Sequence, residues 1–475
     1  MTKALYIFAA ASILQAQSWN PEIPKTWDDE AVQSLELPLA GLGKPATHVS
    51  SEYYYRIPVR KIYKTYPIDD TGREPAAYLE WLKQQEPEVV FDPSKLKTEA
   101  DWIRAGQLVW QSVITPAEGP LAVSAPAPRR RERRYVIRTK GRVENGDSTC
   151  AECHVRYLAD GTSVIGAQGK SWEGRGPGLR KVFADPKLAN HDAVNPFRNH
   201  SVPWLSPDPL EPLKNPTPDV MGPVIDEWVA GTFPRPGTSP LFPPVVPDLI
   251  GIRDRKYFDA TGLIRHRSIG DLMRYAALVT GIERLARYDG FRFYGELPDP
   301  TTLERFSDEQ LYALALYVYS LKPPENPNKF DAGAARGQEI FEREGCAACH
   351  TPPLYTNNML TPVEGFKVPE EHRKQFAVLP VVVGTDTRLA LQTRKGTGYY
   401  RVPSLKGVWY RAPFEHSGSV ATLEDWFDPN RLRDDYVPTG FKGFGVKTRA
   451  VKGHEFGLKL NADDKQALIA FLKAL

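Results

Sequence analysis

The sequence contains little cysteine and methionine, four residues of each among 475, and almost no excess charge. Its 61 Lys and Arg residues nearly balance 58 Asp and Glu residues, which leaves a formal net charge of +3. Nucleic-acid-binding proteins usually carry a clear basic excess, so this balance argues against that class. Hydrophobic residues make up 41% of the chain and aromatic residues 11%, which argues against a disordered chain. At about 100–200 residues per domain, the length predicts a globular protein of about two to four domains.

Long hydrophobic runs are also lacking. A largely apolar run of eleven residues, 4–14, follows Lys3, and at about 1.5 Å per residue it is too short to cross a hydrocarbon core of about 30 Å. A basic residue, a short apolar run and then small and polar residues are typical of a secretory signal peptide. We therefore predict a signal peptide over residues 1–18, no transmembrane segment, and a periplasmic or secreted location.

All four cysteines fall in two Cys-x-x-Cys-His motifs. Two thiols one helical turn apart can form thioethers with the two vinyl groups of a haem, and the next histidine can bind its iron. A redox disulfide would not need the histidines, and a Cys₄ zinc site would leave them incidental. Because histidine follows both pairs and no cysteine is left over, we predict two covalently bound haem c groups. Their attachment sites and proximal ligands are Cys150, Cys153 and His154 in the first motif and Cys346, Cys349 and His350 in the second.

A repeat surrounds these motifs. Similar helical patterns with a Gly-Gln pair precede them at 104–110 and 335–341, and similar segments end each unit at 307–321 and 461–475. Ser307 and Asn461 open the two end segments as N-cap residues. Each unit therefore consists of a helix, the motif, long loops and a helix. We predict a mainly α fold with two tandem cytochrome c-like domains, at 96–325 and 326–475.

Two parts of the chain lie outside this repeat pattern. The N-terminal extension, residues 19–95, has tyrosine-rich alternation that predicts a hairpin over 53–66, and it has a short helical pattern at 76–85. The first unit carries an inserted basic run, Arg129–Arg134, either a solvated loop or a docking patch for an acidic redox partner. With 43 prolines in the chain, we expect long irregular loops and little sheet.

The second unit also carries a long motif, Tyr-Arg-Val-Pro-Ser-Leu-Lys-Gly-Val at 400–408 followed by Ala-Pro-Phe-Glu-His-Ser-Gly-Ser at 412–419. This motif resembles a signature of the bacterial diheme cytochrome c peroxidase superfamily, and the chain resembles particularly its rubber-oxygenase-like branch, over roughly residues 96–475. The resemblance implies two haems that face each other across the junction of the units. It also implies a Ca²⁺ ion between them, although no acidic Ca²⁺ motif is present.

The sixth ligand of each haem decides its chemistry, because a haem with both axial positions filled mainly carries electrons. In small cytochromes the sixth ligand lies on a loop just before the terminal helix, where this chain has His454. The resemblance points to the same residue, since peroxidases place a methionine near here and rubber oxygenases have a bis-histidine haem in this domain. His416 is the alternative ligand, and Met359 is a weaker one.

No sixth ligand is evident for the first haem, although Met273, His200 and His266 remain candidates. The resemblance implies an aromatic relay between the haems at Tyr257 and Phe258. It also implies a distal helix after Ser268 that carries Leu272, Met273 and Arg274, with Leu272 where peroxidases place glutamine, and it makes Glu283 a candidate catalytic acid. Such an apolar distal face suits O₂ binding better than acid–base cleavage of peroxide. These residues could also be ordinary core side chains.

These features predict an exported diheme c-type oxidoreductase. The first haem would activate O₂ or peroxide, and the second would store or relay electrons. Its partners would be an external electron donor or acceptor, such as a small cytochrome or a cupredoxin, a small organic substrate, or both, and no nucleic acid. Two alternatives stay open. The chain could be a pure periplasmic electron carrier with two six-coordinate haems, or a haem-based sensor or maturation partner.

Overall fold

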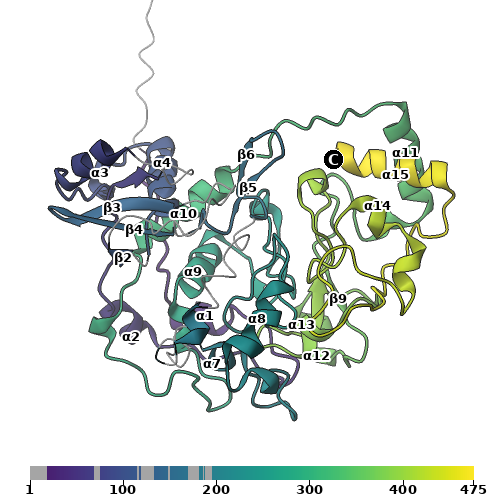
Figure 1. Ribbon diagram of the computed structural model, residues 1–475, viewed down its shortest axis with the longest axis horizontal. Coiled ribbons are helices and arrows are strands. Elements are labelled where there is room, and N and C mark those ends of the chain that lie inside the picture. Colours follow the sequence, from purple (N-terminus) through teal and green to yellow (C-terminus); the bar gives the residue numbers. More distant parts are fainter. Residues whose placement is uncertain are drawn as a thin grey trace, which may run out of the picture.

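The computed structural model describes residues 19–68, 75–114, 117–118, 133–147, 150–169, 181–185, 187 and 195–475. The predicted signal peptide lies outside these residues, and so does the basic run except for Arg133 and Arg134. Helices predominate over strands in the described part, but a small sheet makes the fold more mixed than expected (Figure 1). The predicted domain boundaries remain a prediction.

Each of the two units contains one pair of packed helices. In the first unit α4 (Glu99–Trp110) packs on α10 (Asp308–Ser320), and in the second α11 (Ala332–Arg343) packs on α15 (Ala462–Ala474). Figure 1 shows the two pairs far apart, joined by an extended segment between α10 and α11. These are the four helices that the repeat predicts.

The two helix pairs cross in the same way. A Cβ atom on Gly106 of α4 would lie 2.0 Å from the carbonyl oxygen of Ala313, and one on Gly337 of α11 would lie 2.0 Å from the carbonyl oxygen of Ala467. Only glycine allows two helix backbones to approach this closely. The glycine of each Gly-Gln pair is therefore the point of closest contact between the helices of its unit.

The predicted N-caps are confirmed at both end helices. The Ser307 side chain accepts a hydrogen bond from the amide of Gln310, whose side chain accepts one from the Ser307 amide in return. At the start of α15, Asn461 accepts a hydrogen bond from the amide of Asp464. These bonds satisfy amides that would otherwise have no partner in the first turn of each helix.

A four-stranded antiparallel sheet lies beside the first helix pair, with strand order β1-β3-β4-β2. Its strands are β1 (Thr65–Pro67), β2 (Ala117–Glu118), β3 (Arg133–Thr139) and β4 (Arg142–Asp147). In the register, Tyr66 is opposite Tyr135. The helix α3 (Ala76–Lys83) packs on the sheet through Leu82, which confirms the helix expected at 76–85.

The hairpin expected over 53–66 is wrong. Residues Ser51–Arg56 form the helix α2 instead, and only Thr65–Pro67 is extended, where it pairs with β3. The Ser50 side chain accepts a hydrogen bond from the Tyr53 amide, and Glu52 lies in the first turn, near the positive end of the helix dipole. These local signals outweigh the β-preference of the tyrosines.

The other elements are short and are joined by long loops, as the proline content predicts. They are the helices α1 (Asp29–Gln33), α7 (Pro196–His200), α8 (Pro218–Asp226), α9 (Ile269–Val279), α12 (Glu370–Gln375), α13 (Arg388–Leu391) and α14 (Leu423–Trp426), and the strand pairs β5–β6 (Val155–Tyr157, Ser163–Ile165), β7–β8 (Tyr257–Phe258, Ile264–Arg265) and β9–β10 (Leu360–Pro362, Tyr399–Arg401).

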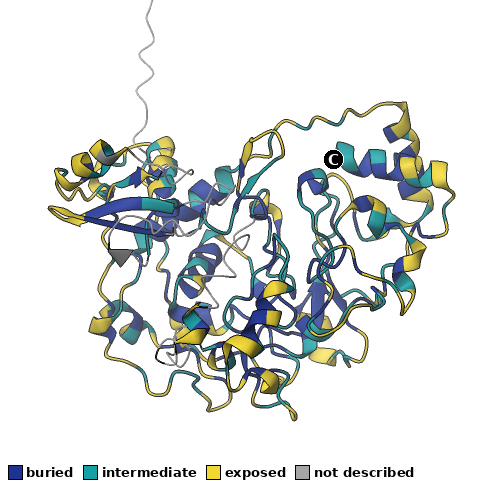
Figure 2. Ribbon diagram, in the orientation of Figure 1, coloured by how far each residue is buried: buried dark blue, intermediate teal, exposed yellow. Residues whose placement is uncertain are grey.

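The N-terminal extension packs into the core of the first unit. Trp27 and Tyr54 are fully buried and stacked with ring centroids 4.6 Å apart, and the Trp27 indole donates a hydrogen bond to the Val49 carbonyl at 2.8 Å. They share one hydrophobic cluster with residues of α4, α9 and α10, and Figure 2 shows the buried inner faces of these helices. Among the described residues, none of the helices combines the length and apolar character needed to span a bilayer.

Candidate functional site

Both Cys-x-x-Cys-His motifs line one continuous cavity of about 510 Å³. The cavity is also lined by α9 in the first unit and by the loops at 245–249, 400–405 and 411–416. A main-chain hydrogen bond connects the two units along this wall. The Val245 amide donates it to the carbonyl of His416 at 2.9 Å. The structure thus brings together two motifs that lie 196 positions apart in sequence (150 to 346).

The two motifs have the same backbone geometry. The His154 amide donates to the Cys150 carbonyl at 3.0 Å, and the His350 amide donates to the Cys346 carbonyl at 2.9 Å. Each hydrogen bond closes one helical turn across the motif. The four cysteines form no disulfide with one another. No three His, Cys, Asp or Glu side chains among the described residues gather into a metal-binding group, so the structure does not form the Cys₄ arrangement of a zinc site.

The histidines of both motifs are held in the form that binds a metal. The Nδ1 atom of His154 lies 3.0 Å from the Pro247 carbonyl, and that of His350 lies 3.1 Å from the Pro403 carbonyl. An Nδ1–H that donates to a carbonyl leaves Nε2 unprotonated. Burial lowers the pKa of His350, and it lowers that of His154 to about 4. Both rings are therefore neutral near pH 7.

His454 faces His350 across the cavity. Their ring centroids are 6.2 Å apart, with 58° between the ring planes. An imidazole nitrogen binds a metal at about 2.0 Å and its ring centre lies about 1.1 Å beyond, so two imidazoles that bind one iron from opposite sides would have centroids about 6.2 Å apart. The observed spacing fits an iron between the two rings.

The backbone of His454 is held in a conformation that few residues adopt. Its φ angle is +48°, in the left-handed region. Arg431 donates hydrogen bonds to the carbonyls of Val451 and His454 at 2.5 and 2.9 Å, and the His454 amide donates to the Val383 carbonyl at 2.7 Å. Burial lowers the pKa of His454 to about 3, so its imidazole is also neutral.

The alternative ligands are placed differently. His416 lines the cavity, but its Nε2 lies 3.0 Å from the hydroxyl of Thr385 and its ring stacks on Tyr400. Met359 is not among the cavity-lining residues. His266 bonds through both ring nitrogens, to the Arg255 carbonyl and the Tyr319 hydroxyl, and His200 bonds to the Thr238 carbonyl.

Only one of the three residues expected on the distal helix reaches the cavity. Leu272 lines it, whereas Met273 is fully buried in the core and Arg274 forms an ion pair with Asp271 at 3.1 Å. Residues three or four positions apart share a helix face, so the cavity-facing side of α9 continues through other positions. These are Tyr275, Ala276 and Val279.

The two residues of the expected aromatic relay do not border the cavity. Tyr257 and Phe258 are buried, and neither lines the cavity. The Tyr257 hydroxyl accepts a hydrogen bond from the Ala377 amide, and the Phe258 ring stacks on Tyr275 with centroids 5.3 Å apart. Both residues therefore serve as core aromatics, and Tyr275 is the aromatic residue of this group that borders the cavity.

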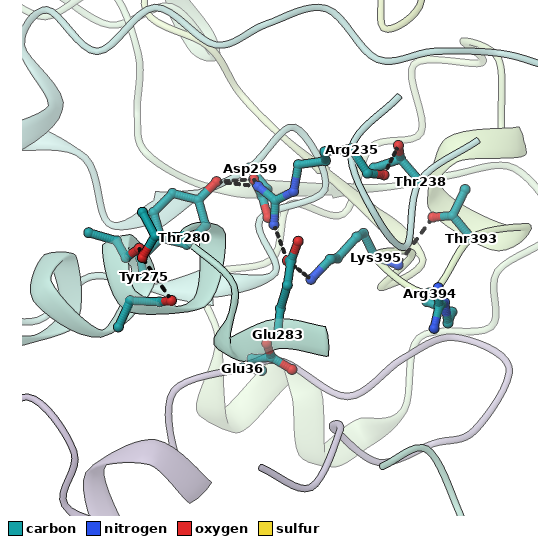
Figure 3. Close-up of polar contacts among 12 residues, drawn as sticks. Glu36, Arg235, Thr238, Asp259, Tyr275, Thr280, Glu283, Thr393, Arg394 and Lys395 are labelled. Atoms are coloured by element: carbon teal, nitrogen blue, oxygen red, sulfur yellow. Dashed lines mark hydrogen bonds and ion pairs between the residues drawn. The ribbon is translucent and has the colours of Figure 1, made fainter. Parts of the chain in front are cut away.

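Charged residues form part of the cavity wall beside α9, which corrects the expectation of an apolar distal face. Arg235 forms ion pairs with Asp259 at 3.0 Å and with Glu283 at 3.2 Å, and Lys395 pairs with Glu283 at 2.9 Å (Figure 3). The Tyr275 hydroxyl accepts a hydrogen bond from Arg235 at 2.7 Å and donates one to Asp259. We call these five residues the charged wall; all but Glu283 line the cavity.

Mutual attraction keeps Glu283 and Lys395 of the charged wall ionised. Burial alone would raise the pKa of the Glu283 carboxyl, but Lys395 and Arg235 hold it below its ordinary value. Burial likewise opposes the charge of Lys395, yet Glu283 raises its pKa. Burial strongly raises the pKa of the Tyr275 phenol, which is therefore protonated at neutral pH. The positive charge of Arg235 also contributes to the low pKa of His154, so the wall acts on the first motif.

Sequence reasoning missed most of the charged wall. Arg235, Asp259 and Lys395 lie in three separate loops, and no local pattern relates them to α9. Glu283 was the one candidate with a sequence signal. Its side chain is buried behind Arg235 and Lys395 instead of bordering the cavity.

Comparisons with known proteins agree with a haem protein. No protein-family model matches the sequence. The chain is 31% identical over 166 residues to cytochrome-c peroxidase IdrP1 of Pseudomonas sp. (strain SCT), a match that covers 31% of this chain and 41% of that protein. It is 28% identical over 155 residues to cytochrome-c peroxidase IdrP2 of Denitromonas iodatirespirans, covering 29% of this chain and 38% of that protein. The matched segment thus spans about two fifths of each relative.

Two solved structures match the chain at low similarity. Kuenenia stuttgartiensis hydrazine synthase, studied under xenon pressure, is 18% identical with a TM-score of 0.30, over 63% of this chain and 92% of that one. A MauG-like protein associated with microbial copper homeostasis is 18% identical with a TM-score of 0.23, over 35% of this chain and 56% of that one. Scores this low do not establish a shared fold. The two named peroxidases are weak homologues, and they support a haem-based oxidoreductase of the cytochrome c peroxidase type and not the rubber-oxygenase branch.

Proposed function

We propose that this protein is an exported diheme c-type cytochrome of the diheme peroxidase superfamily that reduces a peroxide. One haem would be attached at Cys150 and Cys153 with His154 on its iron, and the other at Cys346 and Cys349 between His350 and His454. The observation that carries the proposal is the asymmetry of the cavity. His350 has a facing imidazole at 6.2 Å, whereas among the described residues the aromatic ring beside His154 is the indole of Trp110.

This asymmetry supports a division of roles between the two haem sites. A haem c with two axial histidines transfers electrons, and one with a displaceable axial position can bind and reduce a small oxidant. His154 and the charged wall would therefore form the reaction site. His350 and His454 would hold the relay site, supplied by an external donor such as a small cytochrome or a cupredoxin.

The charged wall favours peroxide as the substrate. Cleavage of an O–O bond requires a proton for the leaving oxygen and positive charge to stabilise the developing anion. The Tyr275 hydroxyl borders the cavity and holds a proton, Asp259 accepts a hydrogen bond from it, and Arg235 and Lys395 supply positive charge. These groups can bind and orient a peroxide and move a proton within one buried network.

One observation favours a second candidate. A bis-histidine arrangement at the second motif is what the resemblance to rubber oxygenases implies, and His350 and His454 have that spacing. In this case O₂ would replace peroxide as the oxidant, with an organic polymer as the substrate. The peroxide assignment requires turnover to depend on Tyr275 and Arg235, whereas the oxygenase assignment does not.

The test uses the exported holoprotein. Its intact mass should exceed that of the polypeptide by two haems, and its ferric electron paramagnetic resonance spectrum should contain one bis-histidine low-spin signal and a second signal that changes with peroxide. Peroxide consumption with a reduced small cytochrome, compared with oxygen uptake on polyisoprene, separates the two candidates. Two low-spin signals that respond to neither oxidant would refute both candidates and identify an electron carrier.

A further inference from the structure

The two motif histidines are held by loops that meet in the cavity wall. The carbonyl of Pro247 holds Nδ1 of His154, and the carbonyl of Pro403 holds Nδ1 of His350. Each proline is followed directly by a residue that takes part in the contact between the loops, Asp248 in the first unit and Ser404 in the second. All four loop residues line the cavity.

Arg411 connects these two loops. Its Nη1 donates hydrogen bonds to the carbonyls of Ser404 and Lys406 at 2.6 and 2.9 Å. Its Nε lies 3.5 Å from Oδ2 of Asp248, an ion pair across the boundary of the units. The neighbouring Tyr410 donates a hydrogen bond to the same carboxylate oxygen at 3.3 Å. The Arg411 guanidinium therefore links Asp248 and Ser404, the residues that follow Pro247 and Pro403.

The ion pair between Arg411 and Asp248 is largely buried, so its charge and geometry affect both loops. The Asp248 side chain is 3% exposed and that of Arg411 is 17% exposed, so water screens this ion pair only partly. Oδ1 of Asp248 accepts a hydrogen bond from the Ile250 amide at 2.9 Å, which fixes the carboxylate. Arginine suits the position because its planar fork reaches two partners at once, whereas lysine has a single charged nitrogen.

We propose that Arg411 is a positioning residue that couples the two haem sites, by tying together the loops whose carbonyls orient His154 and His350. The inference rests on the proposed function, because it assumes that each histidine binds a haem iron. The carbonyl that accepts from Nδ1–H sets the orientation and basicity of a ligating imidazole, and these in turn influence the reduction potential of the metal. A change at Arg411 therefore reaches both haems, although they belong to different units.

The first measurement is the reduction potential of each haem in the purified holoprotein, followed by its absorption bands in a spectroelectrochemical cell. Intact mass is recorded beforehand. A wild-type protein without two haems would refute the proposed function, and the coupling with it, before any potential is measured. In Arg411→Gln we expect both potentials to fall, each with about a threefold to tenfold change in the Fe(III)/Fe(II) ratio, or about 28–59 mV for one electron. A shift in only one haem would overturn the coupling.

A second substitution separates coupling from the loss of charge alone. Asp248→Asn changes the partner of Arg411 on the His154 side. With Arg411 present we expect it to shift the potentials of both haems, and in the Arg411→Gln background only that of the His154 haem. An equal effect on the His350 haem in both backgrounds would show that the charge acts through space, and would overturn the proposal.

Two further variants complete the design. Thr356→Val removes a hydroxyl that donates a hydrogen bond to the Val402 carbonyl at 2.7 Å, next to Pro403 in the second unit. Because this contact lies within the second unit, only the reduction potential of the His350 haem should shift. If Arg411→Gln does not retain two haems, Arg411→Lys replaces it. Lysine keeps the positive charge but cannot reach both loops, so the effect of Asp248→Asn on the His350 haem should again disappear. Its persistence would contradict the coupling.

Discussion

The imidazoles of His350 and His454 face each other with their centroids 6.2 Å apart, the separation that one iron between them requires. Neither ring has the ordinary setting of a surface histidine. The first is hydrogen-bonded through Nδ1 to a proline carbonyl, and the second belongs to a residue with a left-handed backbone. The arrangement of the pair therefore fits the ligand role proposed for it.

Replacing His454 should convert the second haem without removing it. In His454→Met we expect the bis-histidine low-spin signal to be replaced and the potential of this haem to rise, because methionine favours the reduced state. The paramagnetic resonance spectrum and a redox measurement check this result. His416→Asn is the matched control and should leave both haems unchanged. If His416→Asn instead abolishes the signal, the ligand assignment is wrong.

Removing one pair of cysteines should remove one haem. The double variant Cys150→Ala/Cys153→Ala should lose the mass of one haem, and Cys346→Ala/Cys349→Ala should lose the other, since no further cysteine is present in the chain. Intact-mass spectrometry under denaturing conditions measures only covalent haem. A full complement of two haems in either variant would contradict the assignment.

Loss of the Tyr275 hydroxyl should slow peroxide reduction without changing the haem content. Tyr275→Phe keeps the ring packed against Phe258 but removes the proton donor that borders the cavity. We expect kcat to fall by about 10²-fold, the usual contribution of a positioned acid or base. Tyr257→Phe is the control, because Tyr257 is buried outside the cavity. An equal fall in kcat in both variants would show that the Tyr275 hydroxyl of the charged wall does not take part in peroxide reduction.

The charged wall should make stability depend on acidity. Lys395 and Arg235 hold the pKa of Glu283 below its ordinary value of 4.5, so the ionised carboxylate stabilises the fold above about that pH. This contribution is lost as the pH falls from 4.5 through the folded pKa, because the unfolded chain binds the proton more readily. Urea unfolding between pH 3 and 7 should show a weaker pH dependence in Glu283→Gln than in the wild type. If the wild type and Glu283→Gln showed the same pH dependence of unfolding, the lowered pKa of Glu283 would be refuted.

The same wall predicts a large cost for removing a single partner. Lys395→Met leaves the Glu283 charge buried with Arg235 as its remaining ion-pair partner, and loss of one member of a buried ion pair typically costs about 3–5 kcal/mol. Denaturant unfolding at pH 7 measures this loss. Lys452→Met, at an exposed ion pair with Asp434 3.9 Å away, should change the free energy of unfolding by less than about 1 kcal/mol.

The helix crossings should not tolerate a methyl group. Gly337→Ala would place Cβ 2.0 Å from the Ala467 carbonyl oxygen, and we expect a loss of about 1–3 kcal/mol or more, as for other overpacked sites. Gly333→Ala in the same helix meets only the Asp331 side chain, at 3.2 Å, and should be nearly neutral. Thermal unfolding of the two variants gives the comparison.

Features set by neighbouring residues could be predicted from the sequence. The four helices of the repeat follow from local patterns, and Ser307 and Asn461 are capping residues because of their own side chains. The attachment motifs likewise occupy five consecutive positions each. The position of Met273 and Arg274 away from the cavity could also have been predicted, because a helix face that contains Leu272 continues at Tyr275, Ala276 and Val279.

Features that depend on distant segments could not be predicted from the sequence. Arg235 and Lys395 are 160 positions apart (235 to 395) and share Glu283 as an ion-pair partner. The N-terminal extension had no recognisable counterpart, yet its Glu36 lies close enough to Lys395 for that charge to lower the pKa of Glu36. The local sequence around each of these residues is ordinary, so it does not indicate which distant residues they contact.

The origin of Lys395 in the second unit has a consequence for biosynthesis. A nascent chain that has emerged only as far as the joint between the units contains Arg235, Asp259 and Glu283, but not the cation that completes the ion pairs of Glu283. The first unit alone therefore cannot complete the charged wall, which forms only when the second unit has also folded. A chain that ended at this joint would keep the Glu283 carboxylate with Arg235 as its ion-pair partner, so the wall is a shared product of both units.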